Sequence, residues 1–376
     1  MDFARIALTF VAWPGHAFSL TVALNLIYSF ALPRKLQRGG RLAVGILVFL
    51  FPLIALFDFT GPGALAFLVR WYLYFTCVVS LVFLPAMTIR RWLRKPPKEL
   101  IESKSHVVNI AKDLGAAPLG FGKHWRLARF PGNQILEVEF TERTLRLPRL
   151  PLAWNGLTIL HLTDLHFHGT PGKPFFTRVF DLLMEAEPPD LICITGDYVD
   201  SVRHHAWIKA MLGKLKWREG AFAILGNHDF WSAPQSVRRQ VRRAHFVTPG
   251  NGWHLATIRG EPLVVIGHEG PWFRPAPDLS DCPRGSFRLC LSHTPDNIAW
   301  AARNHVDLMF AGHVHGGQVR VPILGPLFVP SRHSRKYDGG CYKLCSTVMY
   351  VSRGLSGREP LRWNCRPEVT RIRLVV

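Results

Sequence analysis

The chain has 376 residues, of which 48% are hydrophobic and 19% are charged, and this balance excludes an intrinsically disordered protein. The length is sufficient for two or three structural units with a sizeable core. Its seven cysteines are odd in number and scattered, so they predict a reducing compartment rather than a disulfide-stapled secreted module. The closest pair, Cys341 and Cys345, lacks the second pair that a structural zinc site needs.

The formal net charge of +20 admits three kinds of partner, namely nucleic acid, an anionic membrane surface or a phosphorylated substrate. The N-terminal region favours the membrane, because three apolar stretches there are each long enough for a helix that spans a bilayer. Buried soluble helices are one alternative. A signal peptide is another, but the basic region that should open it has only Arg5, and no small-residue cleavage site follows the first stretch. We predict a transmembrane anchor over residues 1–90, with spans at 3–32, 42–59 and 71–89.

The basic residues predict the orientation of these spans. The middle loop, around residues 61–63, carries none, whereas they cluster in the first loop and after the third span (Arg34, Lys35, Arg38, Arg41; Arg90, Arg91, Arg94, Lys95, Lys98). The positive-inside rule then places the first loop and everything after residue 90 in the cytoplasm. We expect a multi-pass protein of the cell (inner) membrane with an external N-terminus.

Residues 91–132 are basic and rich in Gly and Pro, which predicts a juxtamembrane linker that lies on anionic headgroups. From Gln134 an imperfect alternation predicts an edge strand running toward Leu147. Short apolar runs and helical patterns then alternate, which favours an α/β domain with a largely buried sheet over residues 133–376. The predicted strands are 157–162, 191–195, 222–225, 263–266, 288–291, 308–310 and 348–352, and the predicted helices are 175–187, 204–215 and 235–244.

Polar residues follow five of these strands directly. In chain order they form Asp-x-His, Gly-Asp-x-x-Asp, Gly-Asn-His-Asp, a single His and Gly-His-x-His (Asp164, His166; Asp197, Asp200; Asn227, His228, Asp229; His293; His313, His315). Ligands of open α/β sheets bind at the carboxyl ends of the strands, so we expect one polar focus. Each motif alone is a weak indication of function, and for histidines outside the motifs, such as His168, a surface position is the simpler explanation. The motifs as an ordered set are difficult to explain as polar residues buried in the core by chance.

His and carboxylate ligands suit two divalent ions of Mn, Fe or Zn better than Ca or a soft thiolate metal. One carboxylate placed between the two ions can bridge them, and the pair can activate a water and clamp a phosphoryl oxygen. A further His that binds no metal and is held by a carboxylate can protonate the leaving oxygen. This chemistry predicts a metal-dependent hydrolase of phosphoric esters or pyrophosphates.

The ordered motifs resemble those of the calcineurin-like metallophosphoesterases over roughly residues 133–376. The resemblance implies a four-layer α/β fold, in which two mixed sheets are flanked by helices. It implies one metal held by Asp164, His166, Asp197 and His315, and another held by Asp197, Asn227, His293 and His313, with Asp197 bridging. It further implies that His228 is the general acid and that Asp229 orients it.

In the protein serine/threonine phosphatases of this family, an Arg follows Gly-Asp-Tyr-Val-Asp. Ser201 stands at that position here, which weakens the interpretation of this chain as a protein phosphatase. The strand before Asp164 and the run 312–318 look more like a bacterial membrane-associated branch of phosphodiesterases, which includes the enzyme that cleaves UDP-2,3-diacylglucosamine in lipid A synthesis. A lipid-linked nucleotide pyrophosphate fits both the anchor and the charge. The alternatives are a broad-specificity phosphodiesterase or phosphatase, a nuclease, and a non-catalytic membrane scaffold. Nucleic acid is disfavoured, because many Arg flank the spans.

Aromatic residues lie next to the motifs and have two interpretations. They line either a pocket for an acyl chain or base, or the ordinary core of the domain, which is the commoner role for such residues. The residues concerned are Phe167, Phe175, Phe176, Trp207, Phe230 and Trp231.

Overall fold

The computed structural model describes residues 3–56 and 63–376, apart from the side chains of Ile54 and Leu56. The chain divides into two compact units. The first, called here the helical unit, comprises the described residues up to Lys95 together with Val321–Lys336. The second, called here the sheet unit, comprises Pro96–Arg320 and Tyr337–Val376.

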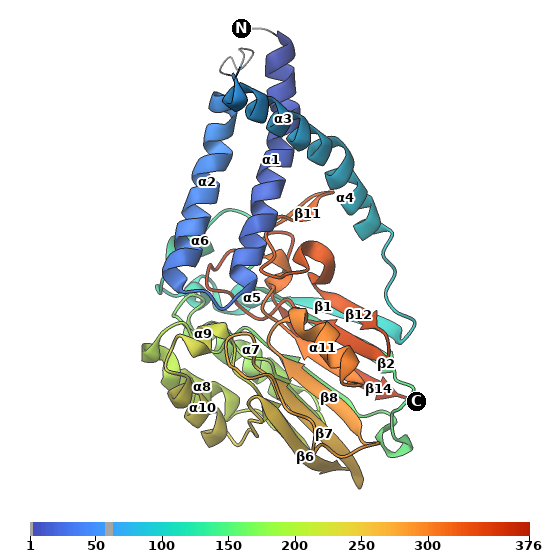
Figure 1. The fold of residues 1–376 in the computed structure, drawn as a ribbon. Helices are drawn as coiled ribbons and strands as arrows, with labels where there is room; N and C mark the ends of the chain where they lie inside the picture. Colours follow the sequence, from blue (N-terminus) through green and yellow to red (C-terminus); the bar gives the residue numbers. More distant parts are fainter. Residues whose placement is uncertain (1–2, 57–62) are drawn as a thin grey trace. The chain divides into compact units, whose positions relative to one another are not determined.

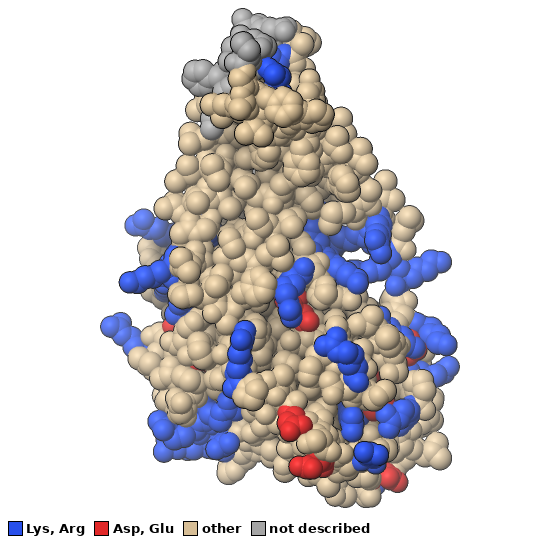
Figure 2. Space-filling model, in the orientation of Figure 1, with Lys and Arg blue, Asp and Glu red and all other residues tan. Residues whose placement is uncertain are grey.

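The helical unit contains α1 (Phe3–Ser29), α2 (Arg34–Leu56), α3 (Ala64–Val78) and α4 (Leu84–Trp92), with a π-helical turn, Val79–Phe83, joining the last two. Three helical stretches have the length and apolar composition to cross a membrane, namely Phe3–Ser29, Arg34–Leu53 and Ala64–Trp92. Their visible face is mainly uncharged in Figure 2. The expected three apolar helices are therefore confirmed, while the end of the predicted second span and the loop positions 61–62 lie outside the described residues.

A segment distant in sequence completes the helical unit. The Asn25 side chain, buried on α1, accepts a hydrogen bond from the Val329 N–H at 2.9 Å and donates one to the Ser334 hydroxyl at 2.9 Å. The Tyr28 ring packs edge-on against Phe328, with ring centroids 5.3 Å apart. The sequence prediction included 321–336 in the domain 133–376, whereas the structure groups this segment with the helices, and these contacts show why.

The sheet unit contains two mixed six-stranded sheets, shown in Figure 1. The first has the order β1–β2–β14–β3–β4–β5, with bounds Leu100–Asn109, Glu137–Arg146, Glu368–Val375, Thr158–Leu162, Leu191–Ile194 and Gly220–Ala223. The second has the order β12–β13–β9–β8–β7–β6, with bounds Gly340–Leu344, Thr347–Val351, Leu308–Ala311, Phe287–Ser292, Glu261–His268 and Gly252–Ile258. A short pair, β10 (Arg320–Val321) and β11 (Gly325–Pro326), lies where the chain passes between the two units.

The two sheets pack face to face, and helices cover their outer faces. One apolar cluster joins residues of both sheets, including Cys193 and Phe222 from the first and Leu289 and Phe310 from the second. Another joins the other face of the first sheet to α7 (Lys173–Glu185), α8 (His205–Leu212) and α10 (Pro234–Arg243). The helix α11 (Ile298–Arg303) packs against β12 and β13. This arrangement confirms the four-layer α/β fold. The remaining short helices are α5 (Ile110–Leu114), α6 (Trp125–Ala128) and α9 (Asn227–Phe230).

The linker prediction is wrong for β1, which lies inside residues 91–132. Residues 100–109 pair with β2 in antiparallel register, from Leu100 opposite Leu145 to Asn109 opposite Glu137. β2 is consequently an interior strand between β1 and β14, and the predicted edge position belongs to β1. Most side chains of β1 are exposed, and their polar character hid the strand from a pattern search that relies on apolar runs.

Candidate metal centre

The candidate ligands lie at the carboxyl ends of five strands, three from the first sheet and two from the second, and Asn227 is the one that follows β5. Asp164 follows β3 and Asp197 follows β4, while His293 follows β8 and His313 follows β9. Five of the candidates have left-handed backbone angles: φ is 55° at Asp164, 45° at His166, 58° at Asp197, 69° at His313 and 49° at His315. Such angles are unfavourable for residues with a Cβ, and their concentration at one place is typical of functional sites.

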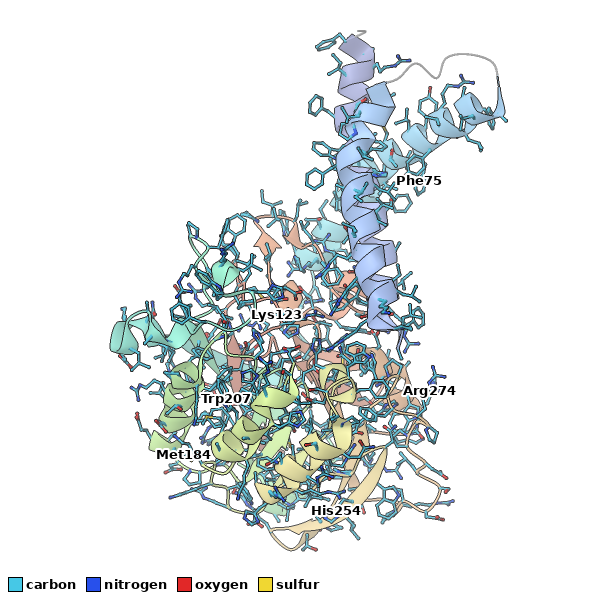
Figure 3. The ribbon with its side chains drawn as sticks, turned by 90° about the vertical axis from the view of Figure 1, so that its left-hand side faces the viewer. Phe75, Lys123, Met184, Trp207, His254 and Arg274 are labelled. Carbon is cyan, nitrogen blue, oxygen red and sulfur yellow. The ribbon has the colours of Figure 1, made fainter. Side chains whose placement is uncertain are left out.

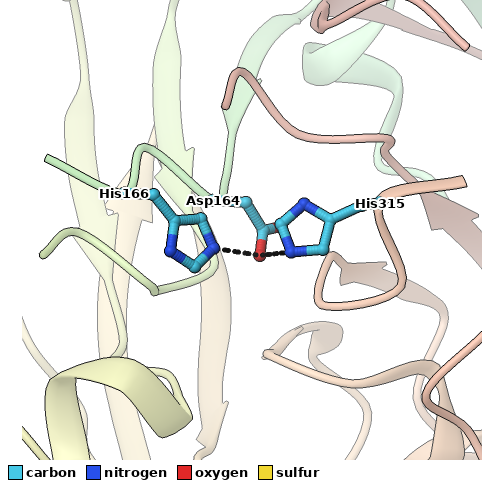
Figure 4. A group of neighbouring side chains, drawn as sticks. All are labelled: Asp164, His166 and His315. Carbon is cyan, nitrogen blue, oxygen red and sulfur yellow. Dashed lines mark ion pairs between the residues drawn. The ribbon is translucent and has the colours of Figure 1, made fainter. Parts of the chain in front are cut away.

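The first cluster consists of Asp164, His166 and His315, shown in Figure 4. Asp164 lies between the two rings, with its Oδ1 at 3.8 Å from His166 Nε2 and 3.5 Å from His315 Nε2. All three side chains are buried or nearly so. Two imidazole nitrogens and a carboxylate oxygen therefore converge on one point, as the ligands of a divalent ion do.

The second cluster consists of Asp197, His293 and His313. Asn227 adjoins it, because its Oδ1 lies 2.9 Å from His293 Nε2. The Asp197 Oδ2 is 3.3 Å from His293 Nε2 and 3.5 Å from His166 Nε2, so this carboxylate lies between the two clusters. The structure thus brings together all seven residues for which the sequence predicted metal ligation.

The polar atoms of these clusters fit a pair of metal ions. Four of them are buried without a hydrogen-bond partner, namely Asp164 Oδ1, His166 Nε2, Asp197 Oδ2 and His313 Nε2. A buried polar atom without a partner is unfavourable by a few kcal/mol, unless a ligand supplies the missing interaction. Nitrogen and carboxylate oxygen donors in this combination suit Mn, Fe or Zn.

Two glycines leave room for the carboxylates. A Cβ at Gly226 would lie 2.2 Å from Asp197 Oδ1, and a Cβ at Gly312 would lie 2.4 Å from Asp164 Oδ2. The backbone N–H groups beside them then bind the same carboxylates, since His228 N donates to Asp197 Oδ1 at 2.8 Å and His313 N donates to Asp164 Oδ2 at 3.0 Å. Each carboxylate therefore has one oxygen held by the backbone and one directed into the site.

The charges of the clusters suit cation binding. Burial alone would raise the pKa of Asp197, but the neighbouring His293 and His228 keep it well below its usual range. Burial lowers the pKa of His315 to about 3 and lowers that of His313 as well. Although burial opposes the charged form, Asp197 raises the pKa of His293 to about 9. The Asp197 carboxylate is therefore anionic, and His313 and His315 are neutral, which are the forms that ligate metals.

The partner of His228 is Asp200, and the prediction that Asp229 orients this ring is wrong. Asp200 Oδ1 contacts His228 Nδ1 directly, and Asp200 Oδ2 lies 3.0 Å from His166 Nδ1. Asp229 instead accepts hydrogen bonds from the backbone N–H groups of Asp197 at 2.8 Å, Tyr198 at 2.9 Å and Gly226 at 2.9 Å. His228 and Asp229 both lie in α9, where consecutive side chains point about 100° apart. The Asp229 carboxylate therefore does not point toward the His228 ring.

One further residue escaped the sequence analysis. The Arg362 side chain is fully buried beside the first cluster, where it donates hydrogen bonds to the carbonyl oxygens of His315 at 3.1 Å and Gly354 at 3.4 Å. These bonds fix the loop that carries His315. A single arginine in the C-terminal region carries no sequence signal for this role, whereas Asp200 could have been found as the second acid of Gly-Asp-x-x-Asp.

The aromatic residues near the motifs were expected to line either a substrate pocket or the ordinary core, and the structure divides them into two groups. Phe167, Phe175 and Phe176 are fully buried in the core beside α7, where Trp207 packs against them, so for these four the core interpretation is correct. Phe230 is 39% exposed, and the Trp231 ring lies edge-on to His228 with centroids 5.7 Å apart. Only these two aromatic residues of the set retain a position suited to substrate contact.

Comparison with known proteins agrees with this geometry. Residues 157–317 match the family model described as calcineurin-like phosphoesterase. The chain is 30% identical over 270 residues to the metallophosphoesterase YkuE of Bacillus subtilis, a match that covers 68% of this chain and 92% of that protein. It is 30% identical over 222 residues to the phosphodiesterase YaeI of Escherichia coli, covering 58% and 82% respectively. It is 26% identical over 312 residues to the UDP-2,3-diacylglucosamine pyrophosphatase LpxG of Chlamydia trachomatis, covering 66% and 92%.

The chain therefore belongs to the calcineurin-like phosphoesterase family. It is a metal-dependent phosphoester hydrolase, and the family uses a dinuclear metal site.

Proposed function

We propose that this chain is a membrane-anchored hydrolase of phosphodiesters or pyrophosphates that uses two divalent ions, with manganese as the expected metal. Asp164, His166, Asp197 and His315 would hold one ion, and Asp197, Asn227, His293 and His313 the other. The observation that carries this proposal is the convergence of two clusters of histidine nitrogens and carboxylate oxygens with Asp197 between them, in which four buried atoms have no hydrogen-bond partner among the described residues.

The residues of the site divide the work of the reaction. Two bound divalent ions would supply Lewis-acid activation of a water and neutralise charge on the phosphoryl oxygens. The chain holds its carboxylates ready through the backbone bonds to Asp197 and Asp164, so little reorganisation is needed when charge develops. Asp200 engages His228 Nδ1, which leaves Nε2 of that ring to donate a proton to the leaving oxygen.

The proposed substrate is a lipid-linked nucleotide pyrophosphate such as UDP-2,3-diacylglucosamine. Three observations support it: the similarity to LpxG, the three apolar helices, and the net charge of +20, which favours an anionic substrate. A phosphodiester that carries no lipid is the second candidate, because YaeI is named a phosphodiesterase.

We propose that the helices span the cell membrane, with the sheet unit in the cytoplasm and the N-terminus on the external side. Support comes from the basic residues of the first loop and of the chain after Arg90, together with the lack of basic residues in the middle loop. A reporter that works only in the cytoplasm should be active when it is fused after Val376, and a reporter that works only outside the cytoplasm should be inactive there. Activity restricted to an external reporter would contradict this orientation.

The function is tested with the full chain purified in detergent and supplied with Mn²⁺. Hydrolysis is measured in parallel on UDP-2,3-diacylglucosamine, bis-p-nitrophenyl phosphate and a phosphomonoester. We expect UMP release from the first substrate to exceed turnover of the others in kcat/KM. The His106→Ala variant, which should keep full activity, serves as a control for the loss of a histidine away from the metal centre, since His106 is exposed on β1, where it stacks on Phe140. Activity on bis-p-nitrophenyl phosphate alone would favour the second candidate, and activity on none of the three would contradict both.

A further inference from the structure

An aromatic and basic surface lies within the sheet unit, outside the metal centre. Residues 121–130, called here the aromatic–basic segment, contain the short helix α6 and begin just before Lys123, which is labelled in Figure 3. Phe121 is 80% exposed and Phe130 58% exposed, and Trp125 is also exposed. Large apolar side chains in contact with water are unfavourable in an isolated soluble domain, and when grouped they mark an interaction surface.

Arginines cover the aromatic rings of this segment. The Arg129 guanidinium lies 4.8 Å from the centre of the Phe121 ring and 4.7 Å from that of Trp125, and Arg126 lies 5.6 Å from the Trp125 ring. Lys123 adds a further exposed cation. The sequence contains no acidic residue between Asp113 and Glu137, so the charge of this surface is uniformly positive along the chain.

The segment is fixed to the metal centre through a loop that follows His166. Gly122 N donates a hydrogen bond to the Gly169 carbonyl at 3.1 Å, and a Cβ at Gly122 would lie 2.3 Å from the His168 carbonyl oxygen. At its other end, Asn133 donates bonds to the carbonyls of Leu127 at 3.0 Å and Pro360 at 2.8 Å. The segment is therefore part of the folded sheet unit and presents its side chains in a fixed direction.

We infer that the aromatic–basic segment docks on the surface of an anionic lipid bilayer. Trp and Phe side chains favour the boundary between headgroups and acyl chains, while Lys and Arg bind anionic headgroups. The three apolar helices keep the chain at a bilayer, so docking needs no independent recruitment from solution. A docked segment would orient the loop after His166 with respect to the membrane surface. The inference goes beyond the proposed hydrolysis and rests only on the helices lying in a bilayer.

The test places a fluorescent probe on the segment in the full chain. Phe121→Cys is labelled with a thiol-reactive NBD dye in a background where the exposed Cys345 is replaced by Ser. The protein is reconstituted into phosphatidylcholine vesicles with or without phosphatidylglycerol, and quenching by brominated acyl chains is measured. We expect blue-shifted emission and strong quenching in the anionic vesicles. The matched control is Leu152→Cys, because Leu152 is 81% exposed in the same unit, and its label should remain unquenched.

Charge reversal then tests the electrostatic part. Arg126→Glu with Arg129→Glu should abolish most of the quenching at position 121, whereas Arg239→Glu with Arg243→Glu, an exposed pair on α10, should leave it unchanged. Thermal unfolding of each variant checks that it is folded. Absence of quenching at position 121 in both vesicle types, or equal quenching at position 152, would overturn the inference. Because no outcome depends on hydrolysis, its failure is distinguishable from failure of the proposed function.

Discussion

The helical unit and the metal centre both bury polar side chains among apolar ones, but they differ in what those side chains contact. In the helical unit the His16 ring bonds to the Tyr72 hydroxyl and the Leu47 carbonyl, and Asn25 bonds to Val329 and Ser334. In the metal centre, four buried nitrogen and oxygen atoms have no hydrogen-bond partner among the described residues. Burying a polar group is unfavourable in either place, and in the metal centre several such atoms gather at one point together with a shared carboxylate, as the ligands of a metal ion do.

A third buried group sharpens this contrast. Glu368, fully buried in the sheet unit, accepts hydrogen bonds from Arg353 Nε at 2.8 Å, from Arg353 N at 3.0 Å and from the Tyr350 hydroxyl. Its charge is thus compensated within the chain. A buried carboxylate is therefore not by itself a sign of metal binding, and the useful sign is the gathering of carboxylate oxygens with histidine nitrogens at one point.

The largest effect is expected from Asp197→Ala, which removes the carboxylate between the two clusters. We expect both metals and nearly all activity to be lost, because each cluster loses a donor. Metal content is measured by elemental analysis of the folded protein. The control is Asp278→Ala, which removes an exposed carboxylate and should retain both metals. Two metals per chain in Asp197→Ala would contradict the bridging position.

The next effect is expected from His228→Ala, which should keep two metals but lose the proton donor. A general acid contributes about 10²–10⁴-fold in rate, and most when the leaving group is poor. We therefore expect a much larger loss of kcat on an alkyl or nucleotide ester than on a nitrophenyl ester. Equal losses on the two substrates, or a drop in bound metal, would remove the general-acid assignment.

A stability effect is expected at Glu368. Burial opposes its charge, yet Arg353 lowers its pKa from 4.5 to about 2. A lowered pKa in the folded state stabilises the protein above the unfolded pKa, and this stability is lost as pH falls from about 4.5 through about 2. At ~1.4 kcal/mol for each pKa unit, the contribution is on the order of 3 kcal/mol.

The measurement compares unfolding of the full chain with that of Glu368→Gln in detergent between pH 7 and pH 3. The variant should be less stable at pH 7, and the gap between the two proteins should narrow as the pH falls. Because the other acidic groups titrate in both proteins, the difference between their free energies of unfolding reports the contribution of Glu368. A gap that stays constant down to pH 3 would mean that the Arg353 pair contributes nothing to the pH dependence.

The smallest effect is expected from Asn25→Leu. Side-chain hydrogen bonds between membrane helices average about 0.6 kcal/mol, so losing two should cost about 1 kcal/mol and lower Tm by about 2–4 °C. Metal content should not change. The matched control is Thr21→Val, because the Thr21 hydroxyl donates its hydrogen bond to the Ala17 carbonyl within its own helix. Equal shifts of Tm in the two variants would show that the hydrogen bonds of Asn25 to Val329 and Ser334 do not stabilise the protein.

The elements with strong apolar patterns were predictable from sequence. The predicted strand 191–195 is observed as Leu191–Ile194, and the predicted helix 235–244 as Pro234–Arg243. Both have clear signals, since one strand is fully buried and one helix has a regular apolar face. β1 was missed because its side chains are largely polar and exposed. Segment 321–336 was misplaced because its partners, such as Asn25, are far away in the chain.

The metal centre was predictable as a set of residues but not in its contacts. Motif order placed seven candidate ligands at strand ends, and the structure brings them together. The sequence prediction gave His228 the wrong partner, Asp229 in place of Asp200, because adjacency in the chain says nothing about side-chain direction within a helical turn. The left-handed backbone at Asp164 and Asp197 was equally invisible, since no residue type requires it.

The return of Val321–Lys336 to the helical unit has a consequence for biosynthesis. Asn25 and Val329 are separated by 304 positions, so the first helix emerges from the ribosome long before the segment that completes its packing. The anchor begins to form first and is finished almost last, after the metal-binding loops have been translated. A nascent chain halted before residue 321 would carry its three apolar helices with Asn25 still lacking both partners.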